Sequence, residues 1–313
     1  MVAVSSGSTA LLMALMALGV VPGDEVILPN RTWIATAHAV HLLGAKVVLV
    51  DVESERPIIA SRKIEKRITT KTKGIIPVHM NGRSADMVKI RDIAKRHSLF
   101  VIEDAAQAIA SRNNEGYLGA QSDIGCFSLS VAKAIATGQG GFAVTNNAML
   151  AKRMRAIRTH GVENVKDPKS WVMAGFNFRF TDVQASIGIV QLKRLLGRIE
   201  RLKEIYLQYE NGLRDTTFKL IPVNIKAGEI PVYSEFLVKN RTEWIKRLED
   251  KGIESRPFYP DIDKASYFSD QKMDFPYSRQ YGIEGIYLPC GPSQSYDNIR
   301  TVIKTIKSIK INA

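Results

Sequence analysis

The stretch Cys126–Phe142, CFSLSVAKAIATGQGGF, decides how the whole chain folds. It begins with alternating apolar and polar residues, which is typical of a β-strand, and it ends in a turn with three glycines. Lys133 lies between the strand and the turn, flanked by Ala132 and Ala134, and the nearest other charge is several residues away. Lysines usually lie on solvated surfaces among other charges, so this position needs a chemical explanation.

From the start of the chain to about Thr145, short β-rich runs alternate with helical patterns. The runs occupy residues 25–29, 46–50, 74–78, 99–103, 124–129 and 141–145. Between two of them, SADMVKIRDIAKRHS (residues 84–98) carries its apolar side chains on one face of a helix. Apolar strands that alternate with amphipathic helices indicate a largely parallel sheet with helices on both faces. The sequence therefore predicts an α/β protein.

The pattern changes after about Phe218. Two further β-rich runs, an amphipathic helix and a lysine-rich final helix are typical of a small α+β domain. A chain of 313 residues, 45% of them hydrophobic, is long enough for one large domain and a smaller one. We therefore expect a large domain over residues 1–205 and a C-terminal domain over residues 206–313.

Composition restricts the class of partner and the compartment. The formal net charge is +13, and basic chains bind nucleic acid, anionic membranes or phosphorylated small molecules. The sequence has no zinc-ligand spacing and no RNA-binding signature, so we expect no metal, nucleic acid or membrane as a partner. Two cysteines, Cys126 and Cys290, are too few for a disulfide framework and fit a reducing cytoplasm. The apolar segment Ala10–Val21 is too short to span a bilayer, and we expect a buried helix there.

The first candidate for chemistry is the turn SSGS (residues 5–8), which leads directly into an apolar helix. Free backbone N–H groups and the helix dipole meet there, and together they favour a bound phosphate. An ordinary helix N-cap with a glycine in the turn explains the same residues. This turn alone does not decide between the two interpretations.

The second candidate is the acidic pair Glu103–Asp104 in VIEDAAQA (residues 101–108). Ligands of parallel sheets bind beyond the carboxyl ends of the strands, and Asp104 lies at such an end. Adjacent strand residues point to opposite faces, so we expect only one of the two carboxylates to face a site. The alternative is again a helix N-cap.

The third candidate is Lys133 itself. Apolar surroundings lower the pKa of a lysine, because desolvation disfavours the ammonium form. A neutral lysine is a better nucleophile toward an aldehyde, and the glycine turn lets a bulky ligand approach. The alternative is a lysine whose ammonium group reaches solvent from the end of a strand.

The order of these three candidates favours one cofactor. A phosphate-binding helix N-terminus, a strand-end carboxylate and an isolated lysine before a glycine turn are the parts needed to hold pyridoxal phosphate (PLP). The first anchors the phosphate, the carboxylate keeps the ring nitrogen protonated, and the lysine carries the aldehyde.

Several spaced motifs make the chain resemble the DegT/StrS family of sugar aminotransferases. They are VSSGSTAL, GDEVILPNRTWIATAHAV, VIEDAAQA, GCFSLSVAKAIATGQGG, GFNFRFTDVQASIG, RPFYP and LPCGP, and they extend over essentially the whole chain. The resemblance implies a PLP enzyme with the aspartate-aminotransferase fold (fold type I). That fold has a large domain with a mostly parallel sheet sandwiched by helices, and a small C-terminal α+β domain.

The resemblance also implies roles for single residues. By position, Lys133 matches the lysine that holds the cofactor as a Schiff base, and Asp104 matches the carboxylate that pairs with the pyridinium nitrogen. These two are the expected catalytic residues. Gln107 matches a residue near the ring hydroxyl. Trp33 falls where the family has an aromatic side chain stacked on the ring, whereas a core tryptophan is the alternative.

Phosphate contacts are implied in the same way. Gly7 and Ser8 match the phosphate loop of the family, and Ser128 matches a further phosphate contact. Asn177, in GFNFRF, matches a residue that reaches the phosphate from the neighbouring subunit. The resemblance therefore implies a homodimer with shared active sites.

Residues at the substrate entrance are implied by shorter motifs. Arg256 and Tyr259, in RPFYP, resemble residues at the mouth of the substrate site. His79 and His160 also lie in stretches that resemble the family, and we expect both to be structural histidines.

The family's activity implies transfer of an amino group, with glutamate as the expected donor, to a nucleotide-linked keto sugar. Such transfers serve amino- and deoxy-sugar biosynthesis for polysaccharides, lipopolysaccharides or secondary metabolites. Dehydratases of the family carry a histidine where this chain has Lys133, so the lysine favours transamination. The chain begins almost at the phosphate loop, whereas relatives carry a longer segment before it. A truncated, catalytically weak relative with a regulatory or binding role is therefore the alternative.

Overall fold

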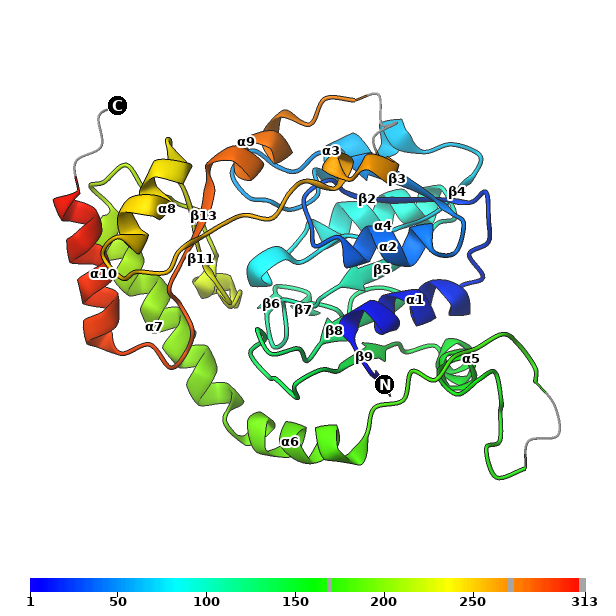
Figure 1. The fold of residues 1–313 in the computed structure, drawn as a ribbon. Coiled ribbons are helices and arrows are strands. Elements are labelled where there is room, and N and C mark those ends of the chain that lie inside the picture. Colours follow the sequence, from blue (N-terminus) through cyan, green and yellow to red (C-terminus); the bar gives the residue numbers. More distant parts are fainter. Residues whose placement is uncertain (168–170, 269–272, 310–313) are drawn as a thin grey trace.

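A seven-stranded sheet forms the centre of the chain in the computed structural model, which describes residues 1–167, 171–268 and 273–309 (Figure 1). Its order is β1-β9-β8-β5-β4-β2-β3. The strands are β1 (Val2–Val4), β2 (Glu25–Pro29), β3 (Lys46–Val50), β4 (Thr72–Ile75), β5 (Phe100–Asp104), β8 (Ile124–Ser128) and β9 (Gly141–Val144). The five strands from β8 to β3 pair in parallel, and β9 runs antiparallel to both of its neighbours, β8 and the edge strand β1. The predicted α/β class with a mostly parallel sheet is confirmed.

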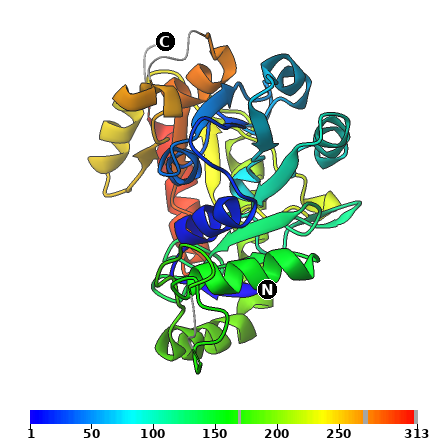
Figure 2. The ribbon, with the colours of Figure 1, turned by 90° about the vertical axis from the view of Figure 1, so that its right-hand side faces the viewer.

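Helices cover both faces of this sheet (Figure 2). Val26 and Leu28 of β2 face one core, which they share with three helices. Ile27, which lies between them, faces the opposite core with two helices. Successive side chains of one strand are thus buried on opposite faces of the sheet. These strands are almost continuously apolar because both of their faces are covered. The helices are α1 (Gly7–Ala17), α2 (Ala35–His41) and α5 (Ala148–Arg158) on the first face, and α3 (Ser61–Ile64) and α4 (Met87–Arg96) on the second.

The predicted buried and amphipathic helices form as expected. Helix α1 takes up most of the apolar segment Ala10–Val21, and it has buried side chains on every side. Helix α4 buries only the four apolar positions of one face: Met87, Ile90, Ile93 and Ala94. In the described part of the chain, no helix is both long and apolar enough to cross a membrane.

A second sheet lies toward the C-terminus and has its own core. Its four strands have the order β10-β11-β13-β12 and are antiparallel. They are β10 (Lys219–Leu220), β11 (Ser234–Leu237), β12 (Arg256–Pro257) and β13 (Gly285–Leu288), and the helices packed on them are α7 (Leu195–Leu213), α8 (Arg241–Glu249) and α10 (Tyr296–Ser308). The predicted division between residues 205 and 206 falls inside α7, whose C-terminal half contributes Ile205 and Tyr209 to this core. That boundary stays a prediction.

Buried ion pairs join the two parts. Arg31, two residues after β2, pairs with Asp261 at 2.7 Å, and both side chains are buried. Arg83 pairs with Glu235 of β11, again away from solvent. The remaining elements are α6 (Asp182–Lys193), α9 (Pro276–Glu284), the hairpin β6 (Arg112–Asn113) and β7 (Gly116–Tyr117), and 3₁₀ turns at Glu65–Arg67, Met80–Gly82, Ile225–Ala227, Ile262–Lys264 and Ser266–Phe268.

Candidate active site

The candidate site lies at the carboxyl ends of β5 and β8, where parallel sheets bind their ligands. Asp104 is the last residue of β5, and its side chain is buried. Thr36 Oγ1 donates to Asp104 Oδ2 at 2.7 Å, and the Ala106 N–H donates to Asp104 Oδ1 at 3.1 Å. Burial raises the pKa of Asp104, and these two hydrogen bonds and Lys133 oppose the rise. A carboxylate in this position favours a cationic partner, which would restore its charged form.

Glu103 points the other way, as the alternation along a strand predicts. Its carboxylate accepts hydrogen bonds from His79 Nε2 at 2.9 Å, the Gly119 N–H at 2.7 Å, the Gln121 N–H at 2.7 Å and Ser122 Oγ at 2.8 Å. The Ala85 N–H donates to Nδ1 of the same histidine, so Nε2 carries the proton that Glu103 accepts. This network is closed within the protein and holds the loop after the hairpin against β5.

Lys133 follows β8 in a loop among small residues. Burial lowers the pKa of its amine, and the carboxylate of Asp104 partly opposes this effect. The loop is fastened on both sides of the lysine: Tyr233 Oη donates to the Ala132 carbonyl at 3.2 Å, and Arg198 donates to the Ala134 carbonyl at 3.1 Å. The structure therefore brings Lys133 and Asp104 within electrostatic reach, although they are 29 positions apart in sequence.

The phosphate turn packs closely against the end of β8. A Cβ atom on Gly7 would lie 2.9 Å from Ser128 Cβ, and a Cβ on Gly141 would lie 2.7 Å from the Gly7 nitrogen. Real Cβ atoms do not approach other atoms this closely, so both glycines are needed for the packing. Three motifs that are far apart in sequence thus meet at one point.

Ser6 is the N-cap of α1. Its hydroxyl accepts the Thr9 N–H at 3.1 Å, and Thr9 Oγ1 accepts the Ser6 N–H at 3.0 Å, which completes a capping box. Gly7 and Ser8 follow in the first turn, where backbone N–H groups have no partner within the helix and the dipole is positive. The N-cap and phosphate interpretations are therefore compatible, because they use different residues.

Trp33 lies between β2 and α2, and 58% of its surface is exposed. Its ring meets that of Tyr259 edge to face, with centroids 5.7 Å apart. Tyr259 lies 4.9 Å beneath the guanidinium of Arg31 and donates to Met80 Sδ at 3.4 Å. Trp33 is therefore an exposed aromatic side chain that Tyr259 contacts edge to face. It is not a buried tryptophan of the core.

Gln107 is half-buried, and its Oε1 accepts the Asn81 N–H at 2.8 Å. The sequence reasoning did not single out Asn81, nor Thr36, whose hydroxyl donates to Asp104 and whose backbone N–H donates to the Trp33 carbonyl. Thr36 follows Trp33 by three positions at the start of a helix, and that spacing was the available signal. Nothing in the sequence around Asn81 signalled its contact with Gln107.

Asn177 and Arg256 are also among the exposed residues of the expected site. Asn177 is exposed, and its Oδ1 accepts a hydrogen bond from Arg179 Nε at 3.0 Å, in a segment that bridges to Thr159 near the edge strand β1. Arg256 in β12 is exposed and pairs with Glu254, with Nε donating at 2.8 Å. Both are available to a partner molecule, whereas Tyr259 is built into the site wall.

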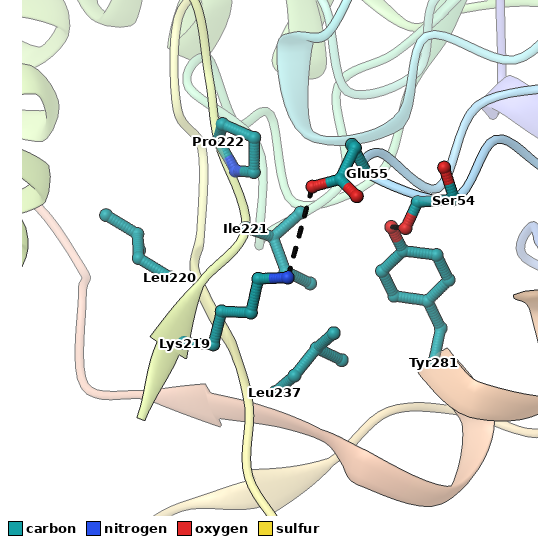
Figure 3. Close-up of a pocket in the computed structure, with 8 residues that line it drawn as sticks. All are labelled: Ser54, Glu55, Lys219, Leu220, Ile221, Pro222, Leu237 and Tyr281. Atoms are coloured by element: carbon teal, nitrogen blue, oxygen red, sulfur yellow. Dashed lines mark hydrogen bonds and ion pairs between the residues drawn. The ribbon is translucent and has the colours of Figure 1, made fainter. Parts of the chain in front are cut away.

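A small pocket at the junction of the two sheets is a different feature (Figure 3). It lies between Ser54, Glu55, Leu237 and Tyr281, its volume is about 10 Å³, and the ion pair between Lys219 and Glu55 at 3.9 Å crosses it. A space of this size holds about one water molecule, so it does not accommodate a cofactor.

The residues of this site have the properties needed to bind pyridoxal phosphate. The amine of Lys133 has a lowered pKa, and a buried carboxylate that favours a cation lies within reach of it. The tight packing of Gly7 on Ser128 sets the helix N-terminus beside a hydroxyl, a combination that suits a phosphate. An exposed tryptophan supplies an apolar face for a ring.

Comparisons with known proteins agree with this geometry. Residues 1–307 match the DegT/DnrJ/EryC1/StrS aminotransferase family. GDP-perosamine synthase of Caulobacter vibrioides is 34% identical over 319 residues, which covers 99% of this chain and 85% of that protein. GDP-perosamine synthase of Escherichia coli O157:H7 is 34% identical over 310 residues, with 97% and 84% covered.

Solved structures with the same fold include one with a bound ketimine intermediate and one with a bound cofactor. DesV of S. venezuelae, in complex with a ketimine intermediate, has a TM-score of 0.92 at 30% identity, and the match covers 98% of this chain and 83% of that one. NtdA of Bacillus subtilis, with bound cofactor PMP, has a TM-score of 0.89 at 31% identity, with 98% and 72% covered.

Proposed function

Because this chain belongs to the DegT/DnrJ/EryC1/StrS aminotransferase family and is a PLP-dependent sugar aminotransferase, we propose that it aminates a keto sugar linked to a nucleotide, with glutamate as the amino donor. The observation that carries the proposal is the placement of Lys133 within electrostatic reach of the buried carboxylate at the end of β5, and burial lowers the pKa of this lysine. The nucleotide is supported by the relatives named GDP-perosamine synthase. The net charge of +13 also suits an anionic sugar nucleotide.

Each site residue has a distinct role in this proposal. When bound, PLP supplies a reactive aldehyde and a ring that accepts electrons. Lys133 Nζ would hold the aldehyde carbon. Once displaced by the amino donor, it would take a proton from the donor's α-carbon and deliver it to the former aldehyde carbon. Asp104 would bind the protonated ring nitrogen, and this cation is the partner that its buried carboxylate favours.

Binding and orientation fall to the other residues. The N–H groups of Gly7 and Ser8 and the hydroxyl of Ser128 would bind the phosphate at the start of α1. Trp33 would cover one face of the ring and exclude water from it. Gln107 would contact the ring hydroxyl. Arg256 and Tyr259 would lie toward the sugar substrate, a role that rests on their motif alone.

We also propose a homodimer in which Asn177 reaches the partner's phosphate. Helix α6 supports this, because it has no buried residue although it carries Val183, Ile189 and Leu192, all exposed. Figure 1 shows α6 along the lower edge of the molecule, away from the small sheet. A helix with exposed apolar side chains and no buried residue indicates a surface covered by another chain. Asn177 lies in the segment just before this helix.

The experiment that tests this proposal is an amino-transfer assay with the purified holoenzyme. Glutamate would be supplied with keto sugars linked to different nucleoside diphosphates, and the same sugars without the nucleotide would serve as controls. We expect equal amounts of amino sugar nucleotide and of the keto acid of glutamate. Transfer to the free sugars at equal efficiency would contradict the role of the nucleotide, and transfer only from another amino acid would contradict the donor.

A further inference from the structure

Asn81 occupies an unusual position beside the site. It lies in the 3₁₀ turn Met80–Gly82 after β4, its side chain is fully buried, and its backbone angles are φ 53° and ψ 39°. This left-handed conformation is uncommon for residues other than glycine, and asparagine is among the few that adopt it readily. A strained, buried polar residue of this kind needs a reason in the surrounding structure.

The hydrogen bonds of Asn81 give that reason. Its backbone N–H donates to Gln107 Oε1 at 2.8 Å. Its side chain pairs twice with the backbone of Tyr233: Nδ2 donates to the Tyr233 carbonyl at 2.9 Å, and the Tyr233 N–H donates to Oδ1 at 2.6 Å. The oxygen and the nitrogen of the side-chain amide are thereby both engaged with one residue, which lies directly before β11 of the second sheet.

Tyr233 extends the connection to the lysine loop. Its hydroxyl donates to the carbonyl of Ala132, the residue before Lys133. Asn81 therefore connects Gln107 on one side with the Lys133 loop on the other, through one residue. The turn that carries Asn81 is itself closely packed, since a Cβ atom on the adjacent Gly82 would lie 2.0 Å from the Ile230 carbonyl oxygen.

This arrangement fixes which end of the Gln107 amide is available. The amide has one acceptor oxygen and two N–H donors, and Asn81 occupies the oxygen. Among the described residues, no acceptor is recorded for Gln107 Nε2. The NH₂ group is thus the end that can face the site, where it would donate to an ionised ring oxygen, whereas the carbonyl oxygen would repel it.

We propose that Asn81 is a positioning residue that holds the Gln107 amide with its NH₂ group toward the cofactor and aligns it with the Lys133 loop through Tyr233. This inference rests on the proposed function, in which Gln107 contacts the ring hydroxyl. Asn81 itself touches neither cofactor nor substrate. Its left-handed backbone aims the N–H at Gln107, and the pairing with Tyr233 holds that backbone in place.

The test is a pH titration of the visible absorption of the Lys133-bound cofactor in four proteins: wild type, Asn81→Ala, Gln107→Ala and the double variant. A donor at the ring oxygen disfavours a proton on the nearby nitrogen, so its loss raises the apparent pKa. We expect a rise of about one pH unit in both single variants, since one unit corresponds to the strength of a single charged hydrogen bond. The rise in the apparent pKa should be no larger in the double variant than in Gln107→Ala alone, because Asn81 acts through Gln107.

Two further variants separate backbone from side chain. Asn81→Gly keeps the left-handed conformation but loses both bonds to Tyr233, so its pKa should rise less than that of Asn81→Ala. It also serves as the second variant if Asn81→Ala does not fold. Asn81→Asp keeps one of the two hydrogen bonds to Tyr233, so its apparent pKa should be closer to that of the wild type than the pKa of Asn81→Gly is.

The outcomes separate this inference from the proposed function. Borohydride reduction followed by peptide mapping reports whether the cofactor is on Lys133 at all. No label on Lys133 in the wild type would overturn the proposed function and the inference with it. A label on Lys133 in all variants, with an unchanged pKa or with additive shifts in the double variant, would overturn the inference alone and leave Asn81 a structural residue.

Discussion

Lys133 and Asp104 each oppose the effect of burial on the pKa of the other. Burial lowers the pKa of Lys133 while the charge of Asp104 raises it, and burial raises the pKa of Asp104 while Lys133 lowers it. Each group is therefore held closer to its charged form by the other than its surroundings alone would allow. A bound cofactor with a cationic ring nitrogen would take over this role toward Asp104 and leave the lysine free to react.

The first prediction concerns this pair. In cofactor-free Asp104→Asn, the pKa of the Lys133 amine should fall, because the opposing negative charge is gone and burial remains. The pH dependence of its reaction with a simple aldehyde measures this pKa. In the holoenzyme, kcat should fall by about a hundredfold or more, the scale for loss of a group that stabilises developing charge.

Asp92→Asn is the matched control, because Asp92 is an exposed carboxylate on α4 that pairs with Arg96. It should change neither the pKa of Lys133 nor kcat. A pKa that rises in Asp104→Asn, or a kcat like that of the wild type, would be incompatible with the proposed role.

The phosphate turn gives a second prediction. Gly7→Ala should weaken cofactor binding by about tenfold or more, because the new Cβ would lie 2.9 Å from Ser128 and displace the N–H groups from the phosphate. Fluorescence titration of the cofactor-free protein gives the Kd. Gly197→Ala is the control, since a Cβ there meets nothing within 4 Å and its φ is not positive. Equal Kd values in the two variants would argue against a phosphate at this turn.

The proposed dimer gives a third prediction. Replacing Ile189 and Leu192 on α6 with glutamate should convert a dimer into a monomer, because two charges would be buried at the interface. Light scattering measures the mass. Val88→Glu, at an exposed apolar position on α4, should leave the mass unchanged. A wild-type protein that is monomeric at assay concentrations would rule out the shared site.

Mixing inactive variants tests whether Asn177 acts in the partner's site. Lys133→Ala and Asn177→Asp, refolded together, should recover about a quarter of the wild-type activity, because half of the dimers are mixed and each has one intact site. No recovery would place Asn177 in the site of its own chain, whereas an Asn177→Asp variant that is active before mixing would place it outside both sites.

The buried pair of His79 and Glu103 gives a fourth prediction, on stability. Burial alone would raise the pKa of Glu103, but hydrogen bonds from His79, Gly119 and Gln121 lower it below its usual range. A lowered folded-state pKa contributes stability above the unfolded-state value of about 4.3, and this contribution is lost as the pH falls further. At pH 7, the free energy of unfolding measured in urea should therefore be about 3 kcal/mol lower for Glu103→Gln than for the wild type.

That difference should shrink as the pH falls below about 4 and the wild-type carboxylate takes up a proton. Glu249→Gln, at an exposed position near the end of α8, should show no such pH dependence. A difference between Glu103→Gln and wild type that is the same at pH 7 and pH 4 would mean that the charge of Glu103 does not contribute.

The sequence predicted the parts of the site that lie in contiguous motifs. The strand end at Asp104, the isolated Lys133 and the turn at Gly7 could be read locally, because each depends on a few neighbouring residues. Their order along the chain was enough to indicate one cofactor.

Contacts made by folding could not be predicted in this way. Asn81 and Gln107 are 26 positions apart, and Asn81 and Tyr233 are 152 apart, so only the packing of the second sheet on the first brings them together. The same holds for Arg31 and Asp261, whose buried pair positions the loop that carries Tyr259. Nor does sequence reasoning reveal that Ser6, rather than Ser8, is the cap of α1.

The most direct measurement of the central claim is peptide mapping after borohydride reduction of the holoenzyme. We predict one covalent cofactor adduct per chain, on Lys133, with loss of the visible absorption band, and no adduct in Lys133→Ala. An adduct on another lysine, or a wild-type protein that binds no cofactor, would contradict the account and would favour the alternative of a catalytically weak protein with a regulatory or binding role.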